Sequence, residues 1–494
     1  MRFVWVPLNG NGINLRQLSG SKPIENSVGW RLWAQLVVVS SGVFLVALDV
    51  TVNVSLPAIS DYFSAEPRIV YLMITFYLGT TIGLQLGIGG AGDTFGLRRI
   101  FLIGLFVYTV AMVAISLSPT INTVIGFRVL QALGNASLAA IAPALVTSMF
   151  PREIRGRALG VMTGIGTLGM ILGTISAGAL LEISSWRWIF LFRIPFCLIA
   201  IAGTLFFLRG VGERVEENKK FDWLGAGLVF AAMTTIVLFL NIVALVGWVR
   251  GQPFLILLIS AIIWVIFIKR QNVFEQPLID LRVLKNMVVA GGLLANLCMF
   301  MSTFVNVFIL PYFVSEIMGA SATSLAILLL VNSLALALCA PLGGYFSDRV
   351  TPGPVTIVGT ILIIFGLLSY QAVEIGVSVT ALAVRMTIIG AGMGLFQSAN
   401  LNLVMSSAGK ASLGTGGALS SITRGIGNVV AVALLGGLFT EAYSSRGHGV
   451  DILLASTTTE SVVAYLAAFK LVYFAAAAIA LGALIASVVA WRRA

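Results

Sequence analysis

Residues 89–99 read Gly-Gly-Ala-Gly-Asp-Thr-Phe-Gly-Leu-Arg-Arg and form a short polar loop between two long apolar segments. A shorter version of the pattern, Gly-Tyr-Phe-Ser-Asp-Arg, occupies residues 344–349 and also follows an apolar segment. The two aspartates, Asp93 and Asp348, lie 255 residues apart. Repeated turns of this kind indicate a chain built from two similar halves.

Two further pairs of matching residues support the internal repeat. Arg128 and Arg385 lie 257 residues apart, and Gly160 and Gly414 lie 254 residues apart, each near the start of an apolar segment. Because the three offsets are nearly equal, the repeat places the first six apolar segments over the last six. The two segments between the halves have no counterpart and are predicted to be an insertion.

The composition excludes a soluble protein. Of the 494 residues, 59% are hydrophobic and only 10% are charged, and the mean hydropathy is +1.02. A soluble domain carries about 25% charged residues. Each of the long apolar runs can cross ~30 Å of hydrocarbon as a helix, whereas strands of a membrane barrel would alternate apolar and polar residues. The fourteen predicted spans are 33–60, 69–91, 100–118, 121–149, 158–182, 187–208, 222–246, 253–268, 287–313, 323–346, 354–370, 379–405, 412–440 and 464–491.

The formal charge of +11 indicates membrane topology and not nucleic-acid binding. With these spans, 21 of the 30 Lys and Arg residues lie on the side of the N-terminal tail, four lie on the opposite side and five lie within spans. By the positive-inside rule both termini are cytoplasmic, which requires an even number of spans. We therefore expect a multi-pass protein of the cell (inner) membrane, whose residues 1–31 form a cytoplasmic tail without a cleaved signal.

The sequence offers few groups for catalysis or metal binding. Cys197, Cys298 and Cys339 fall inside apolar spans without metal-like spacing, and the only histidine, His448, lies in a predicted outer loop. Buried thiols of this kind are usually inert packing residues. We expect no disulfide, no metal, no cofactor other than a coupling proton, and no enzymatic activity.

Four motifs carry a resemblance to a known family. They are residues 48–57 (Leu-Asp-Val-Thr-Val-Asn-Val-Ser-Leu-Pro), the loop 89–99, residues 128–134 (Arg-Val-Leu-Gln-Ala-Leu-Gly) and residues 186–190 (Trp-Arg-Trp-Ile-Phe). From Trp30 onward the chain resembles the major facilitator superfamily, and the first motif is similar to that of its fourteen-span branch of drug:proton antiporters. The resemblance implies an all-α membrane protein with the major-facilitator fold, in which two six-helix bundles and two inserted transmembrane helices work by alternating access.

The chain also departs from the pattern of that branch. Gly173 and Thr174 replace the usual Gly-Pro pair of span five, Leu72 replaces the tryptophan usual in span two, and Arg193 replaces an asparagine in span six. These departures leave open which molecule is transported and whether Thr174 changes the mode of transport.

The repeat and the hydropathy together predict five regions. The 269–286 segment mixes basic residues with Leu281, Val283 and Leu284 and is predicted to be an interfacial amphipathic helix, with a plain connecting loop as the alternative. The inserted helices are expected to lie outside both bundles and to line no part of the substrate path. The regions are a cytoplasmic tail (1–31), an N-terminal six-helix bundle (32–208), a linker with two inserted helices (209–268), a cytoplasmic amphipathic segment (269–286) and a C-terminal six-helix bundle (287–494).

Asp49 is the one carboxylate predicted to lie deep in the membrane, ~15 Å from the outer end of span one. Arg128 lies ~10 Å deep in span four, which is a neighbour of span one in this family. We therefore expect an Asp49–Arg128 pair that faces the central cavity and couples transport to protons. Burial favours a neutral carboxyl and an arginine favours a carboxylate, so a change in hydration can load or release the proton. The alternative is a static ion pair that holds the two spans together.

The repeated turns are expected to act as a conformational latch. A carboxylate on a cytoplasmic turn can interact with a helix N-terminus, and in this family such a contact with the opposite half resembles a latch that stabilises the inward-closed state. Glycines permit the tight turn and the close backbone approach. The alternative is ordinary turn chemistry. The latch candidates are Gly89, Asp93, Gly96, Arg98, Arg99, Asp348 and Arg349.

Polar and aromatic residues of both halves are candidates for a substrate cavity. Arg424 lies ~18 Å from the cytoplasmic end of span thirteen and is too deep to reach the interface easily, whereas Arg193 is expected to reach the outer face. A cavity that contains Arg424 would suit anionic or zwitterionic amphiphiles. Any single polar residue could instead form a hydrogen bond between helices. The substrate-binding candidates are Asn53, Phe76, Tyr77, Gln131, Asn135, Asn296, Met299, Asn306, Gln397, Asn400, Arg424 and Asn428.

These features predict a proton-coupled secondary active exporter, an antiporter of amphiphilic small molecules. Its partners would be an amphiphilic small-molecule or lipid-like substrate, protons and the lipid bilayer, and we expect a monomer. The first alternative is an exporter or flippase of an anionic or zwitterionic metabolite or lipid. The second, a transporter-like membrane scaffold or sensor, requires Asp49 to be dispensable.

Overall fold

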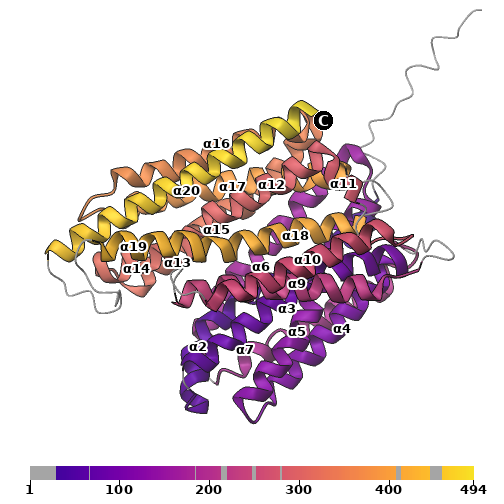
Figure 1. Ribbon diagram of the computed structural model, residues 1–494, viewed down its shortest axis with the longest axis horizontal. Helices are drawn as coiled ribbons and strands as arrows, with labels where there is room; N and C mark the ends of the chain where they lie inside the picture. Colours follow the sequence, from indigo (N-terminus) through magenta and orange to yellow (C-terminus); the bar gives the residue numbers. More distant parts are fainter. Residues whose placement is uncertain are drawn as a thin grey trace, which may run out of the picture.

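A computed structural model describes residues 29–65, 67–183, 185–212, 220–246, 252–278, 281–407, 413–445 and 459–493, and within these ranges the chain is helical and contains no strand (Figure 1). The N-terminal half contains α1 (Trp30–Ala47), α2 (Val50–Phe63), α3 (Pro67–Phe95), α4 (Leu97–Ser116), α5 (Ile121–Met149), α6 (Arg155–Ile183), α7 (Trp188–Leu191) and α8 (Ile194–Phe207). The inserted helices are α9 (Trp223–Val246) and α10 (Gln252–Val273). The short α11 (Leu281–Lys285) then leads to α12 (Met287–Thr303), α13 (Val305–Phe308), α14 (Leu310–Tyr312), α15 (Ala322–Arg349), α16 (Pro352–Leu368), α17 (Val379–Ser407), α18 (Leu413–Ala431), α19 (Gly437–Ser444) and α20 (Thr459–Arg493).

Thirteen stretches of the described chain are long and apolar enough to cross a membrane as helices, and each overlaps one predicted span. The remaining predicted span, 69–91, lies in α3, a helix of 29 residues that is not among the thirteen. The protein is therefore an all-helical, multi-pass membrane protein with thirteen or fourteen spans.

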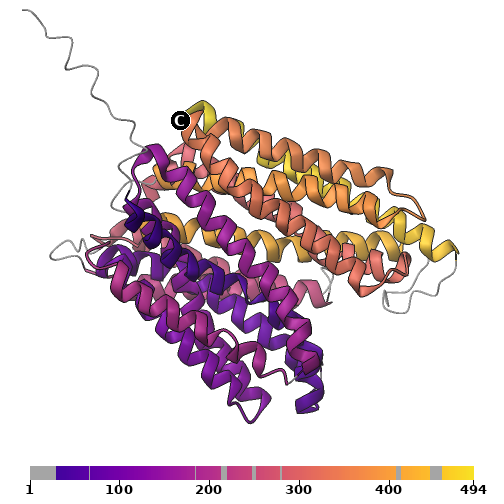
Figure 2. The same cartoon turned by 180° about the vertical axis from the view of Figure 1, so that it is seen from behind.

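The two halves meet along α6 and α15 on one side and along α18, α3 and α5 on the other. In both views the halves lie together at the end where the C-terminus is marked and diverge toward the end that holds α7 and α19 (Figures 1 and 2). The end where they lie together also contains the last turns of α3 and α15, which carry Asp93 and Asp348 of the repeated motif, and we call it the latch end.

Glycines allow the halves to approach closely at the latch end. A β-carbon at Gly89 of α3 would lie 2.6 Å from the carbonyl oxygen of Gly414. On the other side of the repeat, a β-carbon at Gly344 of α15 would collide with the carbonyl of Gly156 in α6. A side chain at either position would push the halves apart, since the obstacle is backbone and cannot rotate away.

The inserted helices α9 and α10 form an antiparallel hairpin beside the N-terminal half. The Ser260 hydroxyl of α10 donates to the carbonyl of Ala232 in α9 at 3.0 Å. The Thr234 hydroxyl of α9 donates to the carbonyl of Gly79 in α3 at 3.2 Å. Because α9 also contacts α18 of the C-terminal half, the hairpin touches both halves while remaining a separate helix pair.

The buried carboxylate of Asp222 anchors the hairpin at the latch end. It accepts a hydrogen bond from the Arg270 guanidinium at 2.6 Å and one from the Gln271 amide at 3.1 Å. Because both side chains are held in this way, α10 continues to Val273 instead of ending with the predicted span at residue 268. The amphipathic helix predicted over 269–286 is therefore divided between the end of α10 and the five-residue α11.

We predict that Lys220 and Asn272, which flank the hairpin, lie on the same side of the membrane. The chain crosses and returns between them, and the neighbouring Asp222 and Arg270 are ion-paired. Single cysteines at either position, in a variant without the three native cysteines, should react with a membrane-impermeant maleimide from the same side of oriented vesicles. Labelling from opposite sides would contradict the hairpin.

Candidate functional site

Asp49 lies at a break in the first membrane span, where Leu48 and Asp49 separate α1 from α2. A break leaves backbone carbonyls without their helical donors, and inside a membrane these carbonyls need other partners. The Leu45 carbonyl accepts a hydrogen bond from the Tyr108 hydroxyl at 3.1 Å, and the Leu48 carbonyl accepts one from Arg193 at 3.0 Å. The break therefore depends on side chains from other helices.

Arg193 lies at a second break, between α7 and α8. Pro195 is at the start of α8, and its missing N–H explains why one helix does not continue through this point. The Arg193 guanidinium forms an ion pair with Oδ1 of Asp49 and donates to the Tyr108 hydroxyl at 3.2 Å. The two breaks thus face each other, and one ion pair joins them.

This position of Arg193 corrects the prediction that its side chain reaches the outer face. The side chain is 0% exposed, and the Asp49 carboxylate and the Leu48 carbonyl accept its hydrogen bonds inside the protein. Because both terminal nitrogens of the Arg193 guanidinium have acceptors inside the protein, its side chain does not extend to the membrane–water interface. The signal that could have revealed it is Pro195, because a proline two residues later predicts a helix break at the arginine.

Arg128 of α5 also faces Asp49, at a greater distance. One of its guanidinium nitrogens lies 3.9 Å from Oδ1 of Asp49 and donates to the side-chain oxygen of Gln131. The guanidinium carbon lies 4.0 Å from the centre of the Tyr77 ring, a cation–π contact. Asp49 therefore faces two buried guanidinium groups, whereas the sequence predicted one.

Four neutral side chains complete the surroundings of Asp49. Gln131 and Asn135 of α5 donate to the carboxylate through their amides at 2.6 and 3.0 Å. The Tyr108 hydroxyl of α4 lies 3.4 Å away, and the Tyr77 hydroxyl of α3 donates to Oδ2. Together with Arg193, these side chains direct donors at both oxygens of the carboxylate.

The C-terminal half repeats the helix break but not the charge. α12 and α13 meet at Phe304, which lies 255 residues after Asp49. Arg385, the repeat partner of Arg128, donates to two backbone carbonyls instead of a carboxylate. Of these two related breaks, only the N-terminal one carries an ion pair.

We predict that Asp49 and Arg193 are strongly coupled in stability. Asp49→Asn leaves a buried guanidinium without its counter-charge and should cost about 3–5 kcal/mol. Asp49→Asn combined with Arg193→Gln should recover part of this loss. Thermal unfolding of the purified single and double variants measures the coupling, and additive losses would show that the ion pair does not support the fold.

Asp93, near the end of α3, lies at the N-terminus of α18 in the opposite half. Its carboxylate accepts hydrogen bonds from the N–H groups of Gly414 and Thr415 at 2.7 and 2.9 Å, and from the Thr415 hydroxyl at 2.9 Å. The same hydroxyl lies 3.3 Å from the carbonyl oxygen of Leu278. This contact therefore joins both halves and the segment that follows the hairpin.

Asp348, near the end of α15, occupies the equivalent position at the N-terminus of α6. Its carboxylate accepts hydrogen bonds from the N–H groups of Gly156 and Arg157, both at 2.7 Å. A negative charge at a helix N-terminus is stabilised by unpaired N–H groups and by the helix dipole. Two repeat-related carboxylates thus connect the halves on both sides of the latch end.

The other latch candidates are not partners in the hydrogen bonds of Asp93 and Asp348 described above. Gly96 precedes α4 with a φ of +98°, a conformation that favours glycine. Arg98 is half-buried, whereas Arg99 and Arg349 are exposed. The Arg349 guanidinium lies 4.5 Å from the centre of the Tyr345 ring.

We predict that Asp93→Asn and Asp348→Asn each favour separation of the halves at the latch end. Loss of the charge at a helix N-terminus costs about 1 kcal/mol, or about fivefold in a two-state equilibrium. Spin labels at the exposed positions Arg209 and Val350, which belong to opposite halves, should show a larger population of long distances. Asp61→Asn, at an exposed site on α2, is the matched control. Unchanged distance distributions in both variants would contradict a latch.

Four substrate candidates of the C-terminal half lie in contacts between its helices. Asn296 of α12 donates twice to α18, both times at 2.9 Å, and Asn400 of α17 donates to α12 at 3.1 Å. Asn306 accepts a hydrogen bond from α20 at 2.9 Å. Met299 is fully buried in the apolar core of that half. In this conformation these four residues hold the bundle together.

The remaining candidates are distributed over both halves. Phe76 of α3 is 45% exposed, and Gln397 and Asn428 are half-buried. The side chain of Asn53 lies outside the part of the chain that the structure describes. Arg424 of α18 lies 3.4 Å from the Ser421 hydroxyl and forms no ion pair with a carboxylate of the described ranges.

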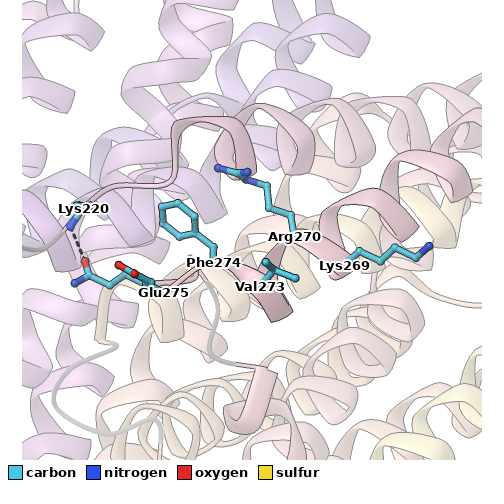
Figure 3. A pocket seen from close by; sticks show the side chains of 7 residues that line it. Lys220, Lys269, Arg270, Val273, Phe274 and Glu275 are labelled. Atoms are coloured by element: carbon cyan, nitrogen blue, oxygen red, sulfur yellow. Dashed lines mark hydrogen bonds between the residues drawn. The ribbon is translucent and has the colours of Figure 1, made fainter.

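A cavity of about 530 Å³ lies at the latch end of the α9–α10 hairpin (Figure 3). Its central cation, Arg270, is already paired with Asp222, and Figure 3 shows Lys269 and Glu275 extending away from each other. The cavity shares no residue with the surroundings of Asp49. Its lining residues are Lys220, Lys269, Arg270, Val273, Phe274, Glu275 and Gln276.

Comparison with known proteins identifies the class of transporter. The family model described as Major Facilitator Superfamily matches residues 39–431 and 292–494. The chain therefore belongs to the major facilitator superfamily, which confirms the family predicted from the motifs. The fourteen-span branch stays a prediction.

Individual relatives are distant but cover most of the chain. It is 27% identical over 429 residues to an uncharacterized transporter, YebQ, of Escherichia coli K12, which covers 86% of this chain and 92% of that protein. It is 27% identical over 440 residues to the riboflavin transporter RibZ of Clostridioides difficile, covering 87% and 94%. Several relatives at 24–26% identity are named as multidrug resistance or efflux proteins. The crystal structure of the human organic anion transporter MFSD10 has the same fold, with a TM-score of 0.63 at 14% identity, covering 92% of this chain and 99% of that one.

Proposed function

We propose that this protein is a proton-coupled secondary active exporter, an antiporter of amphiphilic small molecules that works by alternating access. The observation that carries the proposal is Asp49, a deep carboxylate at a helix break that faces Arg128 and Arg193. A charged group inside a membrane span is costly and is therefore a functional candidate. In this proposal the protein is a monomer of the cell (inner) membrane with both termini cytoplasmic.

Asp49 can bind and release a proton because its partners belong to several spans. The donors around it come from α3, α4, α5 and the α7–α8 break. A shift of any of these helices would remove a donor and make the ionised form of the carboxyl group less stable. One proton that moves inward supplies ~1.4 kcal/mol per pH unit and ~2.3 kcal/mol per 100 mV. One pH unit therefore supports export against about a tenfold concentration gradient.

The contacts of Asp93 and Asp348 supply the conformational part of the proposal. With both contacts formed, the halves are held together at the latch end and diverge at the other end (Figure 1). We assign this arrangement to the state that is open to the outside. Breaking both contacts would let the halves separate at the latch end and open the site to the cytoplasm.

Amphiphilic small molecules are the cargo that the relatives support. Several relatives are named for multidrug resistance or efflux, and another for riboflavin transport. The second candidate function is export or flipping of an anionic or zwitterionic metabolite or lipid. Arg424 favours it, because this cation has no carboxylate partner within the described ranges.

We predict that Asp49→Asn abolishes proton-driven transport but leaves exchange of cargo across the membrane. The amide is nearly isosteric with the carboxyl group but cannot release a proton. Proteoliposomes with an imposed pH gradient and cationic, neutral and anionic fluorescent amphiphiles measure the effect, with Asp61→Asn as the matched control. Because Asp49→Asn leaves Arg193 unpaired, Asp49→Asn/Arg193→Gln serves as the second variant. Gradient-driven accumulation at the wild-type level by both variants would end the proton-coupling proposal and would favour a role without proton transfer.

A further inference from the structure

The charges around Asp49 do not balance. Arg193 and Arg128 both lie within 4 Å of one oxygen of the Asp49 carboxylate, and Arg128 forms no ion pair with any other carboxylate of the described chain. The cluster of these three side chains therefore has a net charge of +1. A buried net charge is costly unless water or a ligand of opposite charge approaches it.

The Asp49 carboxylate has no free acceptor site for a cationic cargo. Its Oδ1 accepts from Arg193 and Gln131, and its Oδ2 accepts from Tyr77 and Asn135. A carboxylate offers about four lone-pair sites, and these four donors occupy them, with the Tyr108 hydroxyl as a more distant fifth donor at 3.4 Å. An ammonium group could reach Asp49 only by displacing one of these donors, against the net positive charge of the cluster.

Arg128, in contrast, retains hydrogen-bonding capacity. Its distance of 3.9 Å to Asp49 is too long for a hydrogen bond. Its one side-chain acceptor in the described chain is Gln131, and its Nε is buried without a partner there. A guanidinium has five N–H donors. Because the Asp49 carboxylate is ion-paired with Arg193, Arg128 is able to bind another anionic group.

We propose that Arg193 determines the charge selectivity of the transporter, because it holds Asp49 and leaves Arg128 to bind an acidic group, such as a carboxylate or phosphate, on an amphiphilic cargo. This inference rests on the proposed transport function and specifies its cargo. Arg193 itself is a positioning residue, since it acts through Asp49 and Arg128.

Arg424 of the opposite half lies at a suitable distance along the membrane normal. α18 packs on α5 where Gly417 meets the backbone of Ala140. Arg424 lies seven residues farther from the latch end than Gly417, and Arg128 lies twelve residues farther from it than Ala140. At ~1.5 Å per residue, the two cations differ in depth by about 8 Å. The two cations, one from each half, are thus less than two helical turns apart along the helix axes.

In the proposed alternating-access cycle, release of an acidic cargo depends on movement of the halves. Protonation of Asp49 makes the cluster more positive, so the proton does not displace an acid by charge alone. Arg128 and Arg424 belong to opposite halves, however, and the distance between them changes when the halves move. Separation of the two guanidinium groups in the rocking step weakens their combined hold on the acid.

The test uses dansyl amphiphiles that share an undecyl chain and end in a carboxylate, a hydroxyl or a trimethylammonium group. Fluorescence titration of the purified full chain gives the ratio of the dissociation constants for the cationic and the acidic probe. The wild type should prefer the acidic probe by about tenfold or more, as expected for a hydrogen bond between the acid and the charged Arg128 side chain. Arg193→Asn should reduce the ratio by about tenfold because Asp49 then pairs with Arg128, while Arg193→Lys keeps the charge and should retain the preference.

Arg128→Gln is the second variant, because it removes the acid-binding group and leaves the Asp49–Arg193 pair intact. It should also abolish the preference, and a structural role alone would instead weaken all three probes equally. A wild-type preference for the cationic probe, or an unchanged ratio in stably folded Arg193→Asn and Arg128→Gln, would overturn the inference. Proteoliposome transport separates the two proposals: acid-selective binding without gradient-driven transport would refute only the proposed function, and gradient-driven transport without charge preference would refute only this inference.

Discussion

The ion pair between Asp49 and Arg193 joins two helix breaks that could not exist separately inside a membrane. Each break leaves polar backbone groups that the hydrocarbon cannot satisfy. Arg193 donates to the Leu48 carbonyl at the first break and neutralises the carboxylate beside it. Pro195 creates the second break and so places the guanidinium in the interior of the bundle. The two helix breaks and the Asp49–Arg193 ion pair therefore depend on each other.

The rest of the N-terminal half is organised around this pair, and the C-terminal half provides the contrast. Tyr77, Tyr108 and Gln131 come from three helices and all direct polar atoms at the Asp49 carboxylate. The related break at Phe304 carries no charge. Asp49 belongs to one half and Arg424 to the other, so in the proposed mechanism movement between the halves changes both the proposed proton site and the proposed cargo site. The proposal assigns control of that movement to Asp93 and Asp348, at the latch end of the same interface.

The sequence was sufficient where a signal is repeated or follows from hydropathy. The spans and the paired turns at Asp93 and Asp348 are of this kind. Asp49 stood out because no other acid lies deep in a span. Sequence alone places Arg193 at the outer face because a buried arginine and one that reaches the interface have similar local sequences, and only tertiary packing distinguishes them. For the same reason, sequence could not tell that Asn296 faces α18, since rotation of an almost wholly apolar helix is set by its neighbours.

Proton coupling in this proposal depends on Asp49 as the group that binds and releases the proton. Infrared difference spectroscopy of the purified protein during a pH jump detects the carbonyl stretch of a protonated carboxyl group directly. We expect a band from a buried carboxyl group that is present in the wild type, absent from Asp49→Asn and retained in Asp61→Asn. If every titrating carboxyl band of the wild type persists in Asp49→Asn, Asp49 does not carry the proton.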